Sequence, residues 1–528
     1  MLLNKDVTIG LGVGEIARKQ LFPLRQKVNW DDEPYRFKYY IGHPFIRLDP
    51  MIPLNCGDEI GTLAAENTDP IKPTALRLFH LLFCLCAPLQ TRRALAPATA
   101  QSAAAGETPA TAFGPSALTT FRGLPSGGGL FPWEVYIAAD GQADLAKANG
   151  VFHYDPAHHR LDVLTGDQRG ALAETTACVP GDIHLCFSAV YWKNYFKYGH
   201  AAVQLHPLDI GIAVAQLSWL APAFGFAASC ALQFADHPLA AAFGLDPEKE
   251  AMYAVVGLTD LMPSPLGRAL TVVARAGTPS VLERSVRGFA TPLARLINDA
   301  SQIDGPYLPA TVSPSTPQRT GDTVLPMDKP SAVTDYLLFR RSGVDSLSRA
   351  NLSADKFSRL HQQASKGLDC DLGAALRPHL RTVWAVQGVE GLEPGLYHDE
   401  TDKPIPTLLE QRERAQIASW LQASYSLTNL NVDACAAVLL LFTKLGDVLA
   451  TFGNRGFRLI NIEAGACVQR LYAASHLLGL GCHALYGLQE EPVRAGTAGI
   501  AAEDSFILGV ALGNPVHPSG KRTMPLWV

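Results

Sequence analysis

Three short segments of this 528-residue sequence carry residue types that can bind an anionic ligand or move a proton. Arg340-Arg341-Ser342 follows an apolar run and offers two guanidinium groups and a hydroxyl, which suit a phosphate because arginine binds it through paired hydrogen bonds. Pro125-Ser126-Gly127-Gly128-Gly129 precedes the apolar run WEVYI, and such a turn lets backbone N–H groups approach a ligand closely. The alternative for the arginine segment is a solvated helix end, and the alternative for the glycine-rich segment is a flexible loop.

The third segment is Lys197-Tyr198 in YWKNYFKYGH, just before a long apolar stretch. A lysine among aromatic residues can have its pKa lowered by loss of solvent, which makes it a usable general base, and the neighbouring phenol can orient it. The alternative is a lysine that reaches solvent beside a packed tyrosine. Lys193 is the competing lysine in the same segment.

Composition and motif spacing exclude several functions. The glycine-rich turn has neither the spacing of a Rossmann nucleotide site nor a Walker lysine. The 10 cysteines form no CxxC pair and no Cys/His set at zinc spacing, so we predict no metal site. A net charge of −5, from 44 basic and 49 acidic residues, argues against nucleic-acid binding. With no signal-peptide pattern at the start of the sequence, we expect a reduced, cytoplasmic protein.

An internal repeat organises the sequence. A shift of 254 residues places Lys197–His200 over Thr451–Asn454 without a gap. The same shift pairs Asp209 with Glu463, Gly211 with Gly465, Val214 with Val468, Leu217 with Leu471 and Gly225 with Gly479. Two further echoes appear in the same order: Gly150–Pro156 with Pro394–Glu400, and Met252–Leu258 with Gly509–Pro515. The sequence therefore predicts two copies of one domain.

The repeat sets the expected domain boundaries. We predict an irregular N-terminal arm over residues 1–60, a first domain over 61–273, a linker over 274–330 that is rich in Pro, Ser, Thr and Gly, and a second domain over 331–528. A low-complexity tract over 96–114 is expected to form a loop inside the first domain. Two copies in one chain imply a pseudo-two-fold dimer within that chain.

Each copy shows the same coarse order of elements: a helix, an apolar strand, a short strand with a turn, a long apolar helix containing glycine, and a closing strand. This order predicts layers of sheet and helix. Ile210–Leu232 is long and apolar enough to span a bilayer. It contains Gln216, Ser218 and Pro222, and its counterpart carries charged residues, so we expect a buried core helix and no membrane span.

The order PSGGGLFPWEVYI, GVFHYDP, KYG, apolar helix and YAVVGL resembles the SagB-type dehydrogenases of the nitroreductase superfamily, which are also described as McbC-like. The resemblance covers most of both halves. It implies an α+β fold with two tandem nitroreductase-like domains, each a mixed or antiparallel sheet flanked by helices, and it implies FMN at their interface. It matches Pro125–Gly129, Arg340–Ser342 and Lys197–Tyr198 to the family's motifs.

The two copies depart from the family in complementary ways. In the first copy, the nearest arginine pair, Arg92-Arg93, is not followed by serine. The second copy has Leu372–Ala375 in place of the glycine-rich turn and Thr451-Phe452 in place of Lys-Tyr. Complementary loss predicts one FMN site built by both halves and one decayed site.

The resemblance implies a role for each residue of that site. Arg340, Arg341 and Ser342 would hold the FMN phosphate, with Arg522 or Lys521 as a further cation. The backbone at Pro125, Ser126, Gly127 and Gly128 would face the flavin ring, and Gly479 and Gly481 would let the backbone approach it. Lys197 would act as the general base, and Tyr198 would orient it or stabilise charge.

The resemblance predicts an FMN-dependent oxidase that converts thiazoline or oxazoline rings of a ribosomally made peptide into azoles, with oxygen as electron acceptor. The precursor peptide, cyclodehydratase and leader-binding proteins are the implied partners, and nucleic acid and membrane are not. Two alternatives remain open: a flavin oxidoreductase acting on another peptide or small molecule, and a flavin-free pseudo-oxidase that serves as a peptide-binding scaffold.

Overall fold

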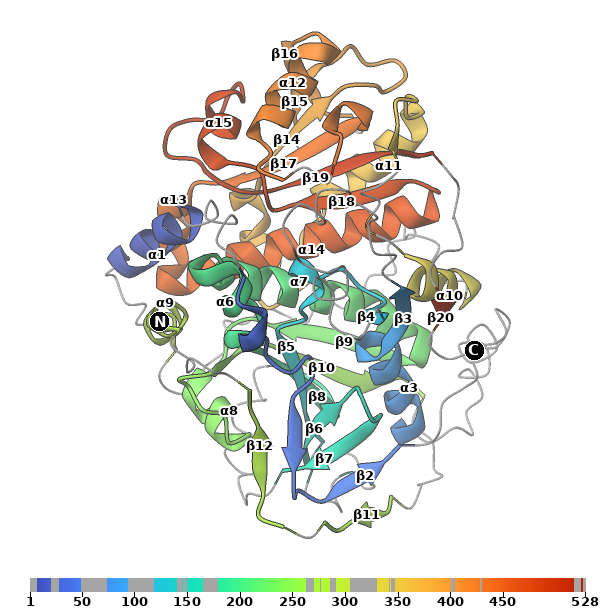
Figure 1. The fold of residues 1–528 in the computed structure, drawn as a ribbon, viewed down its shortest axis with the longest axis vertical. Coiled ribbons are helices and arrows are strands. Elements are labelled where there is room, and N and C mark those ends of the chain that lie inside the picture. Colours follow the sequence, from blue (N-terminus) through green and yellow to red (C-terminus); the bar gives the residue numbers. More distant parts are fainter. Residues whose placement is uncertain are drawn as a thin grey trace, which may run out of the picture.

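The computed structural model describes residues 7–19, 28–48, 74–93, 118–139, 145, 150–164, 179–262, 270–275, 277–284, 291–303, 330–340, 342, 347–399, 403, 405–427, 430–516 and 524–525. The tract over 96–114 lies outside the described residues, as do Arg341, Lys521 and Arg522. The chain forms two halves, each with its own sheet, on either side of a central pair of long helices (Figure 1).

The first half contains an eight-stranded sheet in the order β11-β2-β7-β6-β5-β8-β10-β9, and every neighbouring pair is antiparallel. Its strands are β2 (Phe45–Arg47), β5 (Trp133–Ala138), β6 (Val151–Asp155), β7 (Arg160–Val163), β8 (Ile183–Val190), β9 (Phe226–Ala231), β10 (Glu250–Asp260) and β11 (Val272–Val273). Strands β5 and β6 are buried along their whole length because both faces of the sheet are covered.

The second half contains a seven-stranded antiparallel sheet in the order β13-β19-β17-β14-β15-β16, with β18 also paired to β19. Its strands are β13 (Leu347–Ser348), β14 (Arg381–Val386), β15 (Gly395–His398), β16 (Thr407–Gln411), β17 (Ala437–Thr443), β18 (Gly481–Leu485) and β19 (Ser505–Pro515). The central strands β15-β14-β17-β19-β18 repeat the order β6-β5-β8-β10-β9 of the first half. This repetition agrees with the prediction of an α+β fold.

The strand registers repeat with the same 254-residue shift. Leu258 pairs with Ile183 in the first sheet, and Leu512 pairs with Ala437 in the second. The edge strands β9 and β18 pair with β10 and β19 under the same shift. One expectation needs correction: Met252–Leu258 corresponds to residues 506–512, three positions before the sequence echo, because alternating apolar strands look alike when they slip by a few residues.

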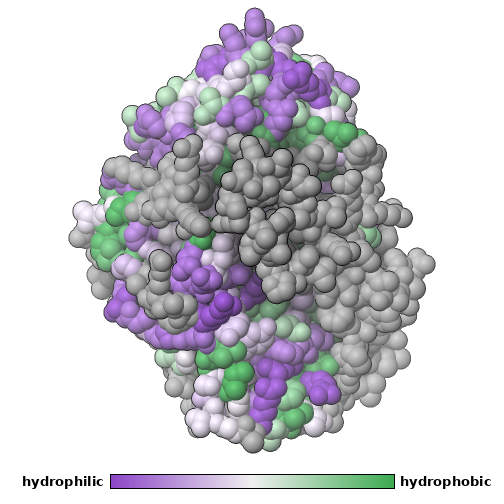
Figure 2. Space-filling view, in the orientation of Figure 1, coloured by the Kyte–Doolittle hydropathy of each residue, from purple (hydrophilic) through white to green (hydrophobic). Residues whose placement is uncertain are grey.

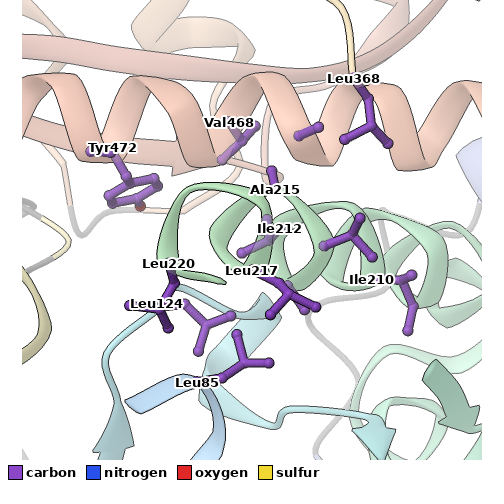
Figure 3. Packing of buried hydrophobic residues seen from close by; sticks show 14 of the residues in the cluster. Leu85, Leu124, Ile210, Ile212, Ala215, Leu217, Leu220, Leu368, Val468 and Tyr472 are labelled. Carbon is purple, nitrogen blue, oxygen red and sulfur yellow. The ribbon is translucent and has the colours of Figure 1, made fainter. Parts of the chain in front are cut away.

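The helices α7 (Ala202–Leu220) and α14 (Gly456–Leu477) cross between the two sheets. A Cβ atom on Gly211 would clash with the carbonyl oxygen of Ile462, and one on Gly465 would clash with that of Leu208. These two contacts are related by the 254-residue shift, as in the interface of a two-fold dimer. Apolar side chains pack around the crossing, including Ile212 and Val468 (Figure 3).

The long apolar segment lies inside the protein. Helix α6 (Trp192–Tyr198) and helix α7 together form the one stretch of the described chain, Trp192–Phe224, that is long and apolar enough to cross a membrane. Most of α7 is buried between the two halves, where it carries Asp209 and Gln216, so it is a core helix as expected. On the face shown in Figure 2, hydrophilic residues gather at the end of the second half, over β16 and α12.

The expected arm and linker contain more structure than their sequences indicate. Residues 1–60 include α1 (Thr8–Lys19), η2 (Trp30–Asp32), β1 (Tyr39–Ile41) and β2, the last of which extends the first sheet. The expected linker contains β12 (Ser280–Leu282), paired with β1, and helix α9 (Pro292–Ala300). Helix α9 forms because Leu293, Ala294 and Ile297 share one face and pack against α1 and the central helices.

The remaining described elements surround this core. They are α3 (Thr74–Cys86), β3 (Pro88–Arg93), β4 (Leu118–Arg122), η4 (Gly127–Gly129), η5 (Gly199–Ala201), η6 (Ala221–Phe224), α8 (Asp236–Ala242), α10 (Pro330–Phe339), α11 (Ala354–Ser365), η7 (Gly373–Ala375), η8 (Arg377–His379), α12 (Arg414–Ser424), η9 (Val432–Ala434), α13 (Leu445–Phe452), η10 (Gly453–Arg455), α15 (Glu490–Ala495) and β20 (Met524–Pro525). Helix α3 precedes the central strands of the first sheet in the chain, and α11 precedes those of the second, in the order that the repeat predicts. Strand β20 pairs with β3, so the end of the chain returns to the first half.

Candidate active site

A cavity of about 450 Å³ lies beside the crossing of α7 and α14 and is lined by both halves. Pro125–Gly128, Lys197 and Tyr198 line it from the first half, and Ser342 lines it from the second. Leu205, Ile212, Val468 and Leu508 contribute much of its apolar wall. The volume falls in the range of small-molecule sites, and a mostly apolar wall with a few polar groups is typical of them.

The glycine-rich turn η4 requires glycine for both backbone and space. Gly128 has φ +65°, and a Cβ atom there would clash with the Tyr198 hydroxyl and lie 2.9 Å from Lys197 Nζ. Phe131, which ends the turn, also has a positive φ of 48°, an unfavourable value for a bulky residue. Its N–H donates to Ser126 Oγ at 2.9 Å, which helps to hold this conformation.

Lys197 and Tyr198 end helix α6 next to this turn. The Lys197 Nζ atom lies 5.9 Å from the ring centroid of Trp30 and 5.3 Å from that of Tyr198. Burial lowers the pKa of Lys197, while Glu33 and Arg36 act in opposite directions and more weakly. Burial raises the pKa of Tyr198, so its phenol stays protonated. The pair therefore offers an ammonium that loses its proton more easily than usual and a neutral hydroxyl.

The competing lysine has a structural contact instead. Lys193 is 3% exposed, forms an ion pair with the buried Glu134, and donates to the carbonyl oxygen of Arg36 at 3.1 Å. It does not line the cavity. The geometry therefore favours Lys197 over Lys193 as the lysine of the cavity, as the repeat alignment does.

The second half contributes a linked set of polar groups. Ser342 Oγ lies 3.1 Å from Tyr472 Oη, which also accepts a hydrogen bond from the N–H of Ala484 at 3.0 Å. The buried Arg340 guanidinium lies 5.4 Å from the Tyr472 ring centroid, and its Nε donates to the carbonyl oxygen of Gly123. Arg340 therefore lies behind the cavity wall and joins the two halves next to the glycine-rich turn.

Asp209 is a polar cavity residue that the sequence did not single out as part of the site. It is 1% exposed on α7, and its carboxylate accepts hydrogen bonds from Ser126 Oγ and from the N–H of Gly127, the latter at 3.1 Å. Burial raises its pKa to about 7, although these hydrogen bonds and Arg122 act in the opposite direction. Its sequence signal is its position as the acidic residue of an otherwise apolar helix.

Further lining residues were also missed, among them Tyr472, His483 and Tyr486. Tyr486 Oη donates toward the carbonyl oxygen of Ala201 and lies 3.1 Å from Gln204 Oε1, so it links the second half to the start of α7. Their sequence segments carry no motif of their own. They reach the cavity because β18 lies at the edge of the second sheet and α14 lies against α7.

Gly479 and Gly481 do not line the cavity. Gly479 has φ +67° two residues after the end of α14, and Gly225 has φ +76° at the end of η6, which follows α7, so a helix end explains the glycine at 479. Gly481 begins β18, where a Cβ atom would meet the side chain of Leu347. The structure therefore gives both glycines another explanation than close approach to a cofactor.

At the pseudo-equivalent position in the other half, two backbone N–H groups bind a carboxylate of the chain itself. Asp371, just before η7, accepts hydrogen bonds from the N–H groups of Leu232 and Gln233 at 2.8 and 3.0 Å. Under the 254-residue shift these residues correspond to Tyr486 and Gly487, which line the open cavity. The N–H groups that correspond to two residues of the open cavity are thus bound by a carboxylate of the chain.

A larger depression of about 890 Å³ lies on the outer face of the second half. Its charged residues are Arg349, Arg414 and Asp433, and both arginines lie within ion-pair distance of Asp433. None of the motif residues line it, so the interface cavity is the better candidate site.

Comparison with known proteins connects the chain to one fold. No protein-family profile matches it, and no curated protein does. A solved structure described as a candidate nitroreductase from Anabaena variabilis superposes with a TM-score of 0.69 at 19% identity, over 96% of this chain and 99% of that one. The chain therefore has a nitroreductase-like α+β fold.

Two other structures match parts of the chain. The Escherichia coli microcin synthetase McbBCD complex with a truncated precursor bound gives a TM-score of 0.27 at 17% identity, over 36% of this chain and 65% of that one. A candidate nitroreductase from Ralstonia eutropha gives 0.25 at 15% identity, over 43% and 93%. Since each covers less than half of this chain, the fold assignment rests on the Anabaena structure.

Proposed function

We propose that this protein is an FMN-dependent oxidoreductase related to the SagB-type dehydrogenases and that it oxidises azoline rings of a ribosomally made peptide to azoles. The observation that carries the proposal is the shared cavity, which collects the glycine-rich turn, Lys197 and Tyr198 from one half and Ser342 from the other. These are the segments that the sequence resemblance assigns to one composite site.

The apolar wall and the hydrogen-bonding groups of the cavity suit a flavin. Its apolar wall can cover the ring system, and the glycine-rich turn leaves room where a side chain at Gly128 would crowd Tyr198. The corresponding residues of the other half supply a further argument: Leu232 and Gln233 donate two backbone N–H groups to the carboxylate of Asp371. We therefore expect the N–H groups of Tyr486 and Gly487 to serve hydrogen-bond acceptors of the ligand.

The proposed roles follow from position. Ser342, with Arg340 behind it and Arg341 from the sequence motif, would bind the phosphate. Bound FMN would supply the hydride acceptor for ring oxidation, and oxygen would regenerate it. Lys197, with its pKa lowered by burial, would accept the proton from the Cα of the azoline ring. Tyr198, as a neutral phenol, would donate a hydrogen bond beside it.

The sequence resemblance alone extends the proposal to partners and location. It implies a precursor peptide, a cyclodehydratase and leader-binding proteins, and a cytoplasmic protein in which two nitroreductase-like domains act as a dimer within one chain. An oxidoreductase with another peptide or small-molecule substrate would use the same cavity and the same cofactor.

The first experiment is the visible spectrum of the purified protein, with released flavin quantified per chain. We expect about one FMN per chain, weaker retention in Ser342→Ala, and loss of FMN in Arg341→Ala. Lys197→Ala should keep its flavin but lose turnover of an azoline peptide. No flavin, even after incubation with excess FMN, would reject the enzyme and favour the scaffold, whereas bound flavin without azoline turnover would point to another substrate.

A further inference from the structure

Asp209 and the glycine-rich turn form a continuous hydrogen-bonded unit in the cavity wall. Ser126 Oγ accepts from the N–H of Phe131 at 2.9 Å and donates to one Asp209 oxygen, while the other Asp209 oxygen accepts from the N–H of Gly127 at 3.1 Å. Asp209 and Ser126 both line the cavity. A buried carboxyl group of α7 therefore fixes both the backbone and the hydroxyl of the turn.

The counterpart of Asp209 is Glu463, and the two carboxylates have different surroundings. Glu463 accepts from the N–H of Leu368 and lies 3.6 Å from Arg470, a cation about two turns further along the same helix. The 254-residue shift places Gln216 where Arg470 stands. Within the described part of the chain, no cation comes within ion-pair distance of Asp209. Among the residues that the structure describes, the buried carboxyl group in the cavity therefore has no direct counter-ion.

The protonation state of Asp209 determines what Ser126 can offer to a ligand. When Asp209 is ionised, the Ser126 hydroxyl must donate to it, and since Phe131 uses one lone pair, the other lone pair can accept from the ligand. When Asp209 is protonated, its O–H can donate to Ser126 Oγ. The Ser126 proton is then available to the ligand. One proton on Asp209 therefore reverses the hydrogen-bonding character of Ser126.

We propose that Asp209 is a positioning residue whose protonation state sets whether Ser126 presents a hydrogen-bond acceptor or donor to the flavin. This inference rests on the proposed function, because it needs FMN in the cavity. The buried carboxyl loses its proton near neutral pH, since burial raises its pKa to about 7. The switch therefore operates within the ordinary range of cellular pH.

Other titratable groups also face this unit. Arg122 on β4 acts on Asp209 through space, and the phenols of Tyr198 and Tyr486 lie close enough to feel its charge. Both phenols have pKa values raised by burial, so they stay neutral where Asp209 titrates. Lys197 and His483 line the same cavity. The test must therefore separate Asp209 from these groups and from the FMN phosphate, which itself titrates near pH 6.

The experiment measures the dissociation constant of FMN by quenching of its fluorescence between pH 5.5 and pH 8.5. It compares wild type with Asp209→Asn, Ser126→Ala and the control Glu463→Gln. We expect the ratio of wild-type to Asp209→Asn affinity to change about tenfold over this range, the effect of one hydrogen bond. The ratio cancels titration of the phosphate. The visible absorption band of bound FMN should shift with pH in wild type and remain constant in Asp209→Asn.

Ser126→Ala keeps the inference testable if Asp209→Asn folds poorly, because it removes the switched hydroxyl from a partly exposed turn. It should lose the same pH-dependent component, whereas Glu463→Gln should follow wild type. A constant affinity ratio together with a pH-independent spectrum, in protein that does bind FMN, overturns the inference and leaves the proposed function intact. Absence of FMN binding by wild type at every pH overturns the proposed function itself.

Discussion

In the flavin-free protein, Asp209→Asn should gain stability relative to wild type as the pH rises from 5 to 8. Burial raises the pKa of the Asp209 carboxyl from an ordinary value of 3.8 to about 7, so between these values the folded chain keeps a proton that the unfolded chain releases. The free energy of unfolding therefore falls as pH rises through this window, by about 1.4 kcal/mol per pH unit. Integrated from pH 5 to pH 8, the loss is about 2.5 kcal/mol.

Asparagine does not titrate in this range and can reproduce the hydrogen bonds of the protonated acid. Its amide can donate to Ser126 Oγ, and its carbonyl oxygen can accept from the N–H of Gly127. Urea unfolding at pH 5, 6.5 and 8 should show the unfolding free energy of Asp209→Asn rising by about 2.5 kcal/mol relative to wild type across the series. The control Glu463→Gln should instead be less stable than wild type at pH 8, because it leaves the mostly buried Arg470 without its carboxylate. A difference between wild type and Asp209→Asn that stays constant from pH 5 to pH 8 would refute the raised pKa.

Three further predictions follow from close contacts. Gly128→Ala should lower FMN affinity at least tenfold, because its Cβ atom displaces the adjacent tyrosine hydroxyl. The control Gly244→Ala has a similar φ of +66° but open space around it, so it should lower only the free energy of unfolding, by the backbone strain of about 1–2 kcal/mol. Equal effects of the two substitutions on FMN titration would contradict this. Gly211→Ala and Gly465→Ala should each destabilise the fold by at least about 2 kcal/mol in urea unfolding and by similar amounts, and strongly unequal costs would argue against a pseudo-two-fold crossing. Lys193→Ala should lower the free energy of unfolding by about 3 kcal/mol because it removes the lysine from a buried ion pair with Glu134, which keeps His153 as a partner, so wild-type stability would show that this ion pair is not structural.

The sequence predicted the arrangement of the two halves best where it is most constrained. Helices α7 and α14 are buried on nearly all sides, and their glycines must coincide at the crossing, so the 254-residue shift survives there. The sequence of strand β10 is less distinctive, because runs of apolar residues still look alike when one is moved along the other by a few positions. The predicted correspondence between β10 and β19 was therefore wrong by three residues. Helix α9 was missed because its nine residues lie in a tract whose composition is typical of linkers.

The candidate site was predictable only in part, for a topological reason. The glycine-rich turn and Lys197-Tyr198 are local patterns, and the structure brings both to one cavity. Tyr472 and Tyr486 reach it from segments more than 270 residues away from Lys197, through the crossing of the helices and the order of the second sheet. No local pattern marks them. Asp209 was visible as a charged residue in an apolar helix, but its partners Ser126 and Gly127 lie 83 and 82 residues away.

The two related halves differ in the charges around their buried carboxylates, and this difference supports the proposal of one site in place of two. In the counterpart of the cavity, Asp371 accepts from the N–H groups of Leu232 and Gln233, and Glu463 has the cation Arg470 beside it. In the open cavity, Asp209 accepts two hydrogen bonds from the glycine-rich turn, and among the described residues no cation lies within ion-pair distance of it. A buried carboxyl group without a nearby cation costs stability, and such groups are retained where they serve a ligand. The difference in counter-ions, more than the loss of motifs, therefore favours the open cavity as the place where this fold gives up stability for binding.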